Sequence, residues 1–399
     1  MKKPLLTNLV AAGAILCLLF TAADARQVAG KHKAGESAAR TEKAEEEASK
    51  AYVVMEPVSG RVLEEKNMHE RRAPASMTKL MVAYIVLDKI TRGEIHLTDK
   101  VPASREASKI GGSQVYLKEG EVFTLEDMMR AVMIASANDA AYAVAEFIGG
   151  TSKAFVGLMN EQAKALGMGD TEFSSVHGLP PSEGQKEDLT SCYDMAVLGR
   201  AILKYPKIIE WTSTKTGEFR SGSFTLNNHN KLLSRMAEVD GLKTGFYRST
   251  GYNVTVTGHK GDLRFIVVVM GSPTSRARDN LALEKLKTYF AEYTVINLAR
   301  KGEPVEKEVV LDDGKYRKLK GVAAADFSLP VLRTRTKAIK KVCNLPPSVK
   351  GEVREGQKLG ELVFQMENEV VGKVDIVSPV YVPKANLFTR IVRKTGLNL

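Results

Sequence analysis

Residues 74–81, PASMTKLM, decide the fold of this chain, because they join a candidate nucleophile to the start of a buried helix. Apolar residues recur at helical spacing after Ser76, which predicts a helix over 77–90. Positions three apart lie on one face of a helix, so the amine of Lys79 can reach the hydroxyl of Ser76. A serine becomes a nucleophile when a base accepts its proton, and a lysine becomes that base when burial lowers its pKa. Taken alone, such a pair is more often a helix cap beside a solvated lysine.

Two further short motifs follow along the chain. The pattern SxN occurs once, at Ser136, just as SxxK occurs only at Ser76, although SAN alone could also cap the helix after it. The pattern KTG occurs three times, beginning at Lys215, Lys243 and Lys394. We choose the copy at Lys243, because it follows VDGL and precedes two more segments with strand character. Lys215 lies in the polar stretch TSTKTGEF, and Lys394 lies beyond the second domain.

Strands and helices are predicted on both sides of these motifs. The stretch YVVMEPVSGRVLEE from residue 52 predicts two strands joined by a turn at 57–60. Three consecutive sheet strands are predicted over 239–244, 252–258 and 263–271, the last with the apolar run FIVVVM. Helical spacing of apolar residues predicts helices over 125–134, 140–148, 152–166, 191–203 and 279–293. This order of elements fits a sheet covered by helices.

The pattern of the sequence changes in its last quarter. From 305 to 382 the chain has short β-branched segments such as VEKEVV and GKVDIV, separated by Gly, Pro and Asp turns, which predicts a small all-β domain. We therefore expect a signal peptide at 1–25, a charged tether at 26–50, a catalytic domain at 51–293, a β-sandwich-like domain at 294–383 and a basic amphipathic segment at 384–399.

In this order, the three motifs resemble those of the penicillin-binding proteins and serine β-lactamases. The contexts PASMTKLM, SANDAA and VDGLKTGF, the segment HGLP at His177 and the added β domain look like the low-molecular-mass D-alanyl-D-alanine carboxypeptidases of peptidase family S11. The resemblance runs from about residue 51 to the end of the chain. It implies an α/β (α+β) transpeptidase fold with a smaller all-β domain, and an enzyme that removes the terminal D-alanine from peptidoglycan stem peptides.

The motifs carry the residues from which we expect catalysis. Ser76 is the predicted nucleophile and Lys79 its base, with the cation of Lys243 lowering the pKa of that base. Ser136 is placed to pass a proton to the leaving amine, and Asn138 can hydrogen-bond the substrate amide. The Ser–Lys scheme leaves no step for an imidazole, so the histidine of HGLP is expected to be structural.

The third motif is expected to bind the substrate. Its strand would pair with the extended peptide, Gly245 would let the ligand backbone approach closely, and Thr244 would contact the terminal carboxylate. The backbone N–H of Ser76 can help to hold the oxyanion, and by resemblance the second N–H comes from Phe246. Also by resemblance, Arg278 supplies a charge to the carboxylate, although an arginine in SRARD is more often a solvated surface residue. Phe246 stands where well-known relatives have a polar residue.

Two rival functions stay open at this point. A β-lactamase would share the acylation step but needs an added glutamate for rapid deacylation, and the sequence identifies none; its middle motif is SAN rather than SDN. A non-catalytic cell-wall binding protein would keep the fold without the reaction. The intact Ser76, Lys79 and Lys243 argue against that second rival.

Composition limits the expected partners. The 58 basic and 47 acidic residues give a net charge of +11, which favours an anionic partner, but no zinc-finger or RNA-binding signature points to nucleic acid. The six histidines are scattered and the cysteines are not at ligand spacing, so we expect no metal. The mechanism requires no cofactor. We expect stem peptides ending in D-Ala-D-Ala as substrates and β-lactam antibiotics as inhibitors.

Both ends of the chain predict a location outside the cytoplasm. Two lysines, an apolar run over 9–20 and Ala23-Asp24-Ala25 are typical of a cleaved signal peptide, with an uncleaved signal anchor as the alternative. At the other end, Leu387, Phe388, Ile391 and Val392 recur at helical spacing among basic residues. We therefore expect an exported enzyme attached peripherally to the outer face of the cytoplasmic membrane. The alternative is a frayed tail that packs on the β domain.

Overall fold

The computed structural model describes residues 49–367, 369–387 and 389 of the chain. The predicted signal peptide, nearly all of the predicted tether and most of the predicted amphipathic segment lie outside these residues. The chain divides into two compact units: residues up to His259 with Arg264–Lys287, and Lys260–Leu263 with the residues from Thr288 onward. Among the described residues, every helix is too short or too polar to span a bilayer.

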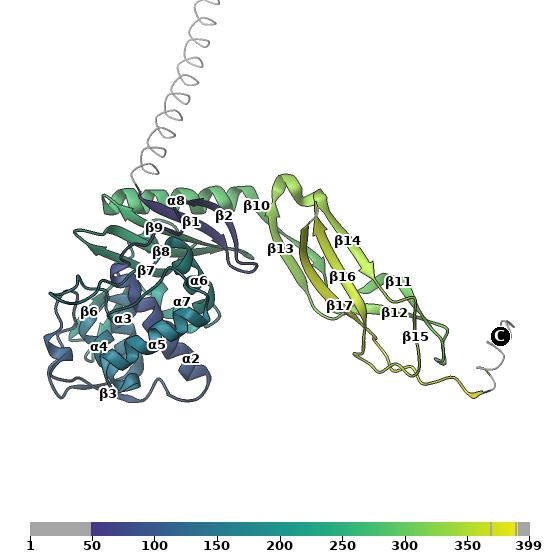
Figure 1. Cartoon of the computed structure of the whole chain (residues 1–399), viewed down its shortest axis with the longest axis horizontal. Coiled ribbons are helices and arrows are strands. Elements are labelled where there is room, and N and C mark those ends of the chain that lie inside the picture. Colours follow the sequence, from purple (N-terminus) through teal and green to yellow (C-terminus); the bar gives the residue numbers. More distant parts are fainter. Residues whose placement is uncertain (1–48, 368, 388, 390–399) are drawn as a thin grey trace, which may run out of the picture. The chain divides into compact units, whose positions relative to one another are not determined.

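A five-stranded sheet organises the first unit (Figure 1). Its order is β2 (Arg61–Lys66), β1 (Ala51–Glu56), β9 (Leu263–Ser272), β8 (Gly251–Lys260) and β7 (Val239–Tyr247). β1 pairs antiparallel with β2 and β9, and β7 pairs antiparallel with β8, so the predicted hairpin and the three predicted strands are confirmed. β7, which carries the chosen KTG motif, is therefore an edge strand.

Helices cover both faces of this sheet, with α8 on one face and the other helices on the opposite one (Figure 1). The predicted helices are confirmed with small shifts at their ends: α2 (Lys79–Thr91), α3 (Leu125–Ile134), α4 (Asn138–Gly149), α5 (Ser152–Ala165), α6 (Cys192–Ile202) and α8 (Ser275–Glu292). α8 begins one turn earlier than predicted. Its Lys285 lies 2.7 Å from Glu64 of β2, which ties the helix to the sheet.

Several short elements escaped the sequence prediction. They are α7 (Lys207–Ser213), the pair β3 (Lys100–Pro102) and β4 (Val122–Thr124), the pair β5 (Thr216–Phe219) and β6 (Phe224–Asn227), and the turns η2 (Ala107–Lys109) and η3 (Lys231–Ser234). Each is too short for a periodic pattern to emerge. The stretch TSTKTGEF, read only as polar, thus runs into a strand of a small hairpin.

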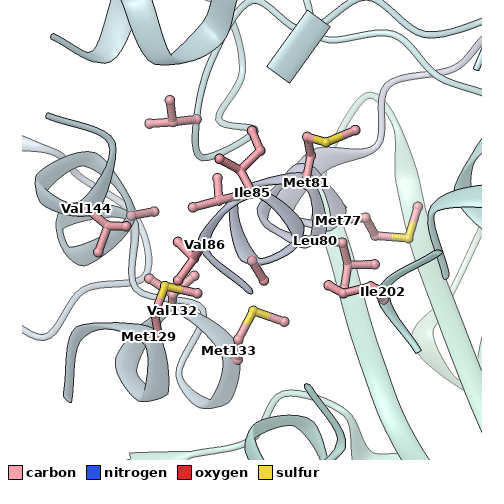
Figure 2. Close-up of a cluster of buried hydrophobic side chains, with 14 of the residues drawn as sticks. Met77, Leu80, Met81, Ile85, Val86, Met129, Val132, Met133, Val144 and Ile202 are labelled. Carbon is pink, nitrogen blue, oxygen red and sulfur yellow. The ribbon is translucent and has the colours of Figure 1, made fainter. Parts of the chain in front are cut away.

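The core of the first unit is built around α2 (Figure 2). Side chains of α2 and of the helices around it meet in one buried cluster: Leu80, Met81, Ile85, Val86, Met129, Val132, Met133 and Val144. Burial of each such side chain stabilises the fold by about 1.5–3 kcal/mol. Because α2 is enclosed, the turn before it is held in place, and that turn carries Ser76.

From β10 to β17 the second unit is all β apart from one short turn, as predicted for the C-terminal domain. A six-stranded sheet has the order β14-β16-β17-β12-β11-β15, and β10 pairs with β13. The bounds are β10 (Tyr293–Ala299), β11 (Pro304–Leu311), β12 (Lys318–Ala323), β13 (Phe327–Leu332), η4 (Arg333–Ala338), β14 (Ile339–Asn344), β15 (Ser348–Val349), β16 (Lys358–Met366) and β17 (Glu369–Val377). Phe327 stacks on Phe364 with ring centroids 5.1 Å apart, which packs the small pair against the larger sheet.

Candidate active site

Ser76 lies in a short 3-10 turn, η1 (Ala75–Thr78), that leads directly into α2. The turn is held between α2 and β7, and of the residues 73–83 only Ser76 keeps partial contact with solvent. No side chain caps η1 or α2, so Ser76 is not a helix cap. Its hydroxyl is the one polar side-chain group of this segment that an external reagent can reach.

Lys79 is fully buried, and its amine lies within hydrogen-bond distance of three oxygens. These are Oγ of Ser76 at 3.2 Å, Oδ1 of Asn138 at 2.6 Å and the main-chain oxygen of His177 at 2.6 Å. Two of the acceptors come from segments far away in the sequence. The amine is therefore held against the Ser76 hydroxyl by the tertiary fold as well as by helical spacing.

The surroundings of Lys79 favour its neutral form. Burial is the main reason that the pKa of Lys79 lies well below its ordinary value of 10.5, and the positive charge of Lys243 lowers it further. The carboxylates of Asp188 and Asp139 act in the opposite direction with smaller effect. Since only a neutral amine accepts a proton, this environment prepares Lys79 to act as a base.

Ser136 stands immediately before α4 in an unusual conformation. Its φ of +60° lies in the left-handed region that residues other than glycine rarely adopt. The N-cap of α4 is Ala137 and no side chain caps the helix, so the alternative role of SAN as a cap is wrong. The buried Oγ of Ser136 has no hydrogen-bond partner among the described residues. A buried unpaired hydroxyl costs about 1–3 kcal/mol, which a group bound at this point would recover.

Asn138 begins α4 and connects it to two other segments. Its amide oxygen accepts from Lys79, its amide nitrogen donates to the carbonyl of Gly111 at 2.7 Å, and its backbone N–H donates to Ser113 at 2.7 Å. An amide nitrogen carries two hydrogens, so one remains for a further acceptor. Asn138 thus orients Lys79 and keeps one donor available.

The KTG copy at Lys243 is the one that lies beside Lys79. Lys243 is only 2% exposed in β7, and its amine donates to the carbonyl of Thr244 at 3.2 Å. Burial and the positive charge of Arg278 lower the pKa of Lys243 to about 7. Lys215 of another copy is exposed, and the third copy lies outside the described residues.

Gly245 allows β7 to pack against the turn that carries the nucleophile. A Cβ at this position would lie 2.3 Å from the carbonyl oxygen of Pro74. We predicted that this glycine admits a ligand backbone; the close approach in the structure is made by the protein's own Pro74. Thr244 is nearly buried beside it, and no strand among the described residues pairs with the outer side of β7.

Phe246 and Arg278, the last two predicted site residues, differ in solvent exposure. Phe246 is 51% exposed and stacks on Tyr252, with ring centroids 4.1 Å apart. Arg278 is buried in α8, where it hydrogen-bonds Asp279 at 2.6 and 2.8 Å and lies 6.0 Å from the Tyr252 ring. It is therefore not the solvated arginine that its sequence context favours. Its guanidinium already has a carboxylate partner, so a substrate carboxylate would share it with Asp279.

Two further residues belong to the surroundings of this site and were missed from the sequence. Asp188 accepts from the backbone N–H groups of Ser174 and Ser175 and from the hydroxyl of Thr78, which joins the loop before His177 to η1. Burial raises the pKa of the Asp188 carboxyl. No motif marks Asp188 in the sequence.

The second missed residue is His229. Burial lowers its pKa to about 4, and the charges of Lys243 and Lys79 add to this effect. For His177, burial likewise lowers the pKa to about 4, and its Nδ1 accepts from the backbone N–H of Leu179. Both rings are therefore neutral at neutral pH. Within the part of the chain that the structure describes, no three His, Cys, Asp or Glu side chains gather as a metal site requires.

Comparisons with known proteins agree with this geometry. Residues 38–274 match the family model described as D-alanyl-D-alanine carboxypeptidase, peptidase S11, and residues 293–384 match the C-terminal domain of penicillin-binding protein 5. D-alanyl-D-alanine carboxypeptidase DacF of Bacillus subtilis is 34% identical over 352 residues, which cover 87% of this chain and 89% of the relative. DacC of Escherichia coli is 33% identical over 354 residues, 86% of each chain.

Solved structures show the same relationship. Penicillin-binding protein 5 of Haemophilus influenzae has a TM-score of 0.71 at 28% identity and covers 84% of this chain and 98% of its own. Penicillin-binding protein D2 of Listeria monocytogenes, in its ampicillin-bound form, has a TM-score of 0.55 at 31% identity and covers 60% and 96%.

Three features define the class of the penicillin-binding proteins and serine β-lactamases. A serine precedes a helix that starts with a buried lysine, a strained serine precedes a helix that starts with an asparagine, and a third motif lies on a sheet edge. Within that class, the chain belongs to peptidase family S11, the serine D-alanyl-D-alanine carboxypeptidases of bacterial cell-wall synthesis.

Proposed function

We propose that this carboxypeptidase works through an acyl-enzyme on Ser76. Lys79 takes the Ser76 proton as Oγ attacks the carbonyl carbon of the penultimate D-alanine. The new C–O ester bond forms, the C–N bond breaks, and the terminal D-alanine leaves after its nitrogen receives a proton. Water then hydrolyses the ester and restores Ser76. The observation that carries this proposal is the buried Lys79 amine, 3.2 Å from the Ser76 hydroxyl, with a lowered pKa.

Ser136 is proposed to relay the proton from Lys79 to the leaving nitrogen. Its buried Oγ has no partner among the described residues, so a substrate nitrogen would supply the missing one. A hydroxyl can accept one proton while it donates another, which suits a relay between two nitrogens. Asn138 is proposed to donate its remaining amide hydrogen to a substrate carbonyl.

The edge of β7 is proposed to hold the peptide by main-chain hydrogen bonds. The oxyanion would lie between the backbone N–H groups of Ser76 and Phe246. The terminal carboxylate would lie near Thr244, with Lys243 and Arg278 supplying positive charge. The low exposure of these two cations supports this role, because electrostatic attraction is stronger away from water.

A β-lactam is proposed to acylate Ser76 and to remain attached, because its leaving nitrogen stays tethered to the product. Two measurements on purified protein test the proposal together: release of D-alanine from a peptide ending in D-Ala-D-Ala, and covalent labelling by a fluorescent penicillin. We expect both in the wild type and neither in Ser76→Ala. Labelling of Ser76→Ala at the wild-type yield would rule Ser76 out as the nucleophile. Rapid hydrolysis of penicillin without D-alanine release would identify a β-lactamase, and neither activity would identify a binding protein.

We also propose that the chain is exported and held at the membrane by its basic C-terminal segment. Leu387, the last fully described apolar residue of that segment, is 71% exposed, so it is available to a lipid surface. The test is deletion of residues 386–399, after cleavage of the signal peptide has been verified. We expect the enzyme to leave the membrane fraction with its peptidase activity intact. Equal retention of the truncated and full-length chains would refute the anchor.

A further inference from the structure

A pocket of about 450 Å³ lies at the end of β7, immediately after the KTG motif. Three of its eleven lining residues are cations, Lys50, Arg72 and Arg248, and none of the eleven is acidic. Phe246, the residue whose backbone N–H is assigned to the oxyanion, forms part of its wall. The pocket is therefore adjacent to the predicted catalytic site and shares Phe246 with it.

The fold brings two of these cations together over a glycine. Gly271 has a φ of +71°, and a Cβ there would lie 2.7 Å from Cγ of Lys50 and 2.9 Å from Nε of Arg72. Both side chains occupy the space that a larger residue would fill. Arg72 pairs with Glu70 through Nη1 at 2.6 Å, but its buried Nε has no partner among the described residues. Arg72, which lines the pocket, thus has one buried donor without an acceptor among the described residues.

The third cation of the lining, Arg248, directly follows β7. Arg248 is exposed, and its side chain makes no hydrogen bond or ion pair within residues 49–367, 369–387 and 389. The lining also includes the aromatic pair of Phe246 and Tyr252, which are cross-strand partners and stack at 24°. A ligand that combines an anionic group with an aliphatic chain matches a lining made of cations and aromatic rings.

The direction of the bound peptide leads to this pocket. In the proposed function the terminal carboxylate lies at Thr244 and the reacting carbonyl at Phe246. Residues upstream of the D-Ala-D-Ala end must then continue along β7 toward Arg248. Peptidoglycan stem peptides carry free or amidated carboxylates on these upstream residues, so an acidic group can arrive beside the cations.

We propose that this pocket is a specificity subsite for an upstream carboxylate of the stem peptide, bound by Arg248 with Lys50 and Arg72. The aliphatic part of that residue packs on Phe246. The subsite rests on the proposed direction of the peptide. It predicts that the enzyme distinguishes stem peptides with free carboxylates from those with amidated ones.

The test compares two pentapeptides that end in D-Ala-D-Ala and differ only in whether their upstream carboxylates are free or amidated. A diacetylated tripeptide ending in D-Ala-D-Ala, whose only charge is its terminal carboxylate, reports on the catalytic machinery by itself. For the wild type at low salt, we expect kcat/KM to be about fivefold higher for the free pentapeptide, the size of a good exposed ion pair. High salt should shrink this preference. In Arg248→Glu, the ratio should fall to one or below.

Lys153→Glu is the matched control, since it reverses an exposed charge on α5, which contributes no residue to the pocket. It should keep the wild-type ratio. A wild-type ratio of one, or an unchanged ratio in Arg248→Glu, would overturn the subsite while tripeptide hydrolysis leaves the proposed function intact. Failure of the wild type to hydrolyse the tripeptide would instead overturn the proposed function.

Discussion

Replacement of Lys79 by methionine separates catalysis from packing at the centre of the site. Methionine keeps an unbranched chain of similar size, so the fully buried position is not emptied. The change removes the amine that lies 3.2 Å from the Ser76 hydroxyl. No other titratable side chain among the described residues hydrogen-bonds that hydroxyl.

The expected loss follows from this geometry. A positioned general base contributes typically 10²- to 10⁴-fold, so acylation of Lys79→Met should slow by that factor. This corresponds to about 3–5 kcal/mol in the activation barrier. The stability of the variant should change less than its rate. The oxygens of Asn138 and His177 lose a hydrogen-bond donor, which lowers the stability of the fold. The removal of a buried amine with a lowered pKa raises stability and offsets this loss.

The assay is the rate of fluorescent-penicillin labelling at neutral pH under single-turnover conditions, with thermal unfolding measured on the same samples. A matched variant, Lys215→Met, alters an exposed lysine of another KTG copy and should label at the wild-type rate. If folded Lys79→Met labels within tenfold of the wild type, the assignment of Lys79 as the base is wrong.

Three further predictions concern the third motif. Lys243→Ala should lose most D-alanine release, whereas Lys215→Ala should retain it. In the wild type, kcat/KM should fall as pH rises through about 7, where Lys243 loses its charge, and should fall again in acid, where Lys79 gains a proton. Because the charge of Lys243 lowers the pKa of Lys79, the acid limb in Lys243→Ala should move to higher pH. Gly245→Ala should destabilise the fold by about 1–3 kcal/mol through overpacking and slow penicillin labelling. Gly217→Ala should be milder, because its Cβ would meet only the ends of side chains, Nη2 of Arg130 at 3.0 Å and Cδ1 of Ile134 at 3.3 Å, rather than backbone.

Each of these three predictions would be contradicted by a specific result. Loss at Lys215 with activity kept at Lys243 would show that the wrong KTG copy was chosen. A pH profile of residual Lys243→Ala activity that keeps its acid limb in place would remove the electrostatic link to Lys79. Equal thermal unfolding of Gly245→Ala and the wild type would mean that β7 does not pack tightly against the nucleophile turn.

Local sequence patterns predicted the long elements well. α3 was predicted to the residue, and α2, α5, α6 and the three sheet strands within a few residues, because each has enough apolar positions to show its period. α7 and the hairpin of β5 and β6 were missed, since four to seven residues show no period. The order of the three motifs indicates the class of enzyme from the sequence alone.

What the sequence determined by itself is the chemistry of its motifs: which serine and lysine share a helical face, and which residue types can form an acyl-enzyme. Tertiary structure alone decided the environment of those groups. Asn138 and the His177 carbonyl reach Lys79 across 59 and 98 residues of chain, Arg278 reaches the carbonyl of Asn253 across 25 residues, and the cations near Gly271 converge beside Phe246. Helical spacing is a local property, whereas burial, pKa and charge pairing depend on segments that only the folded chain brings together.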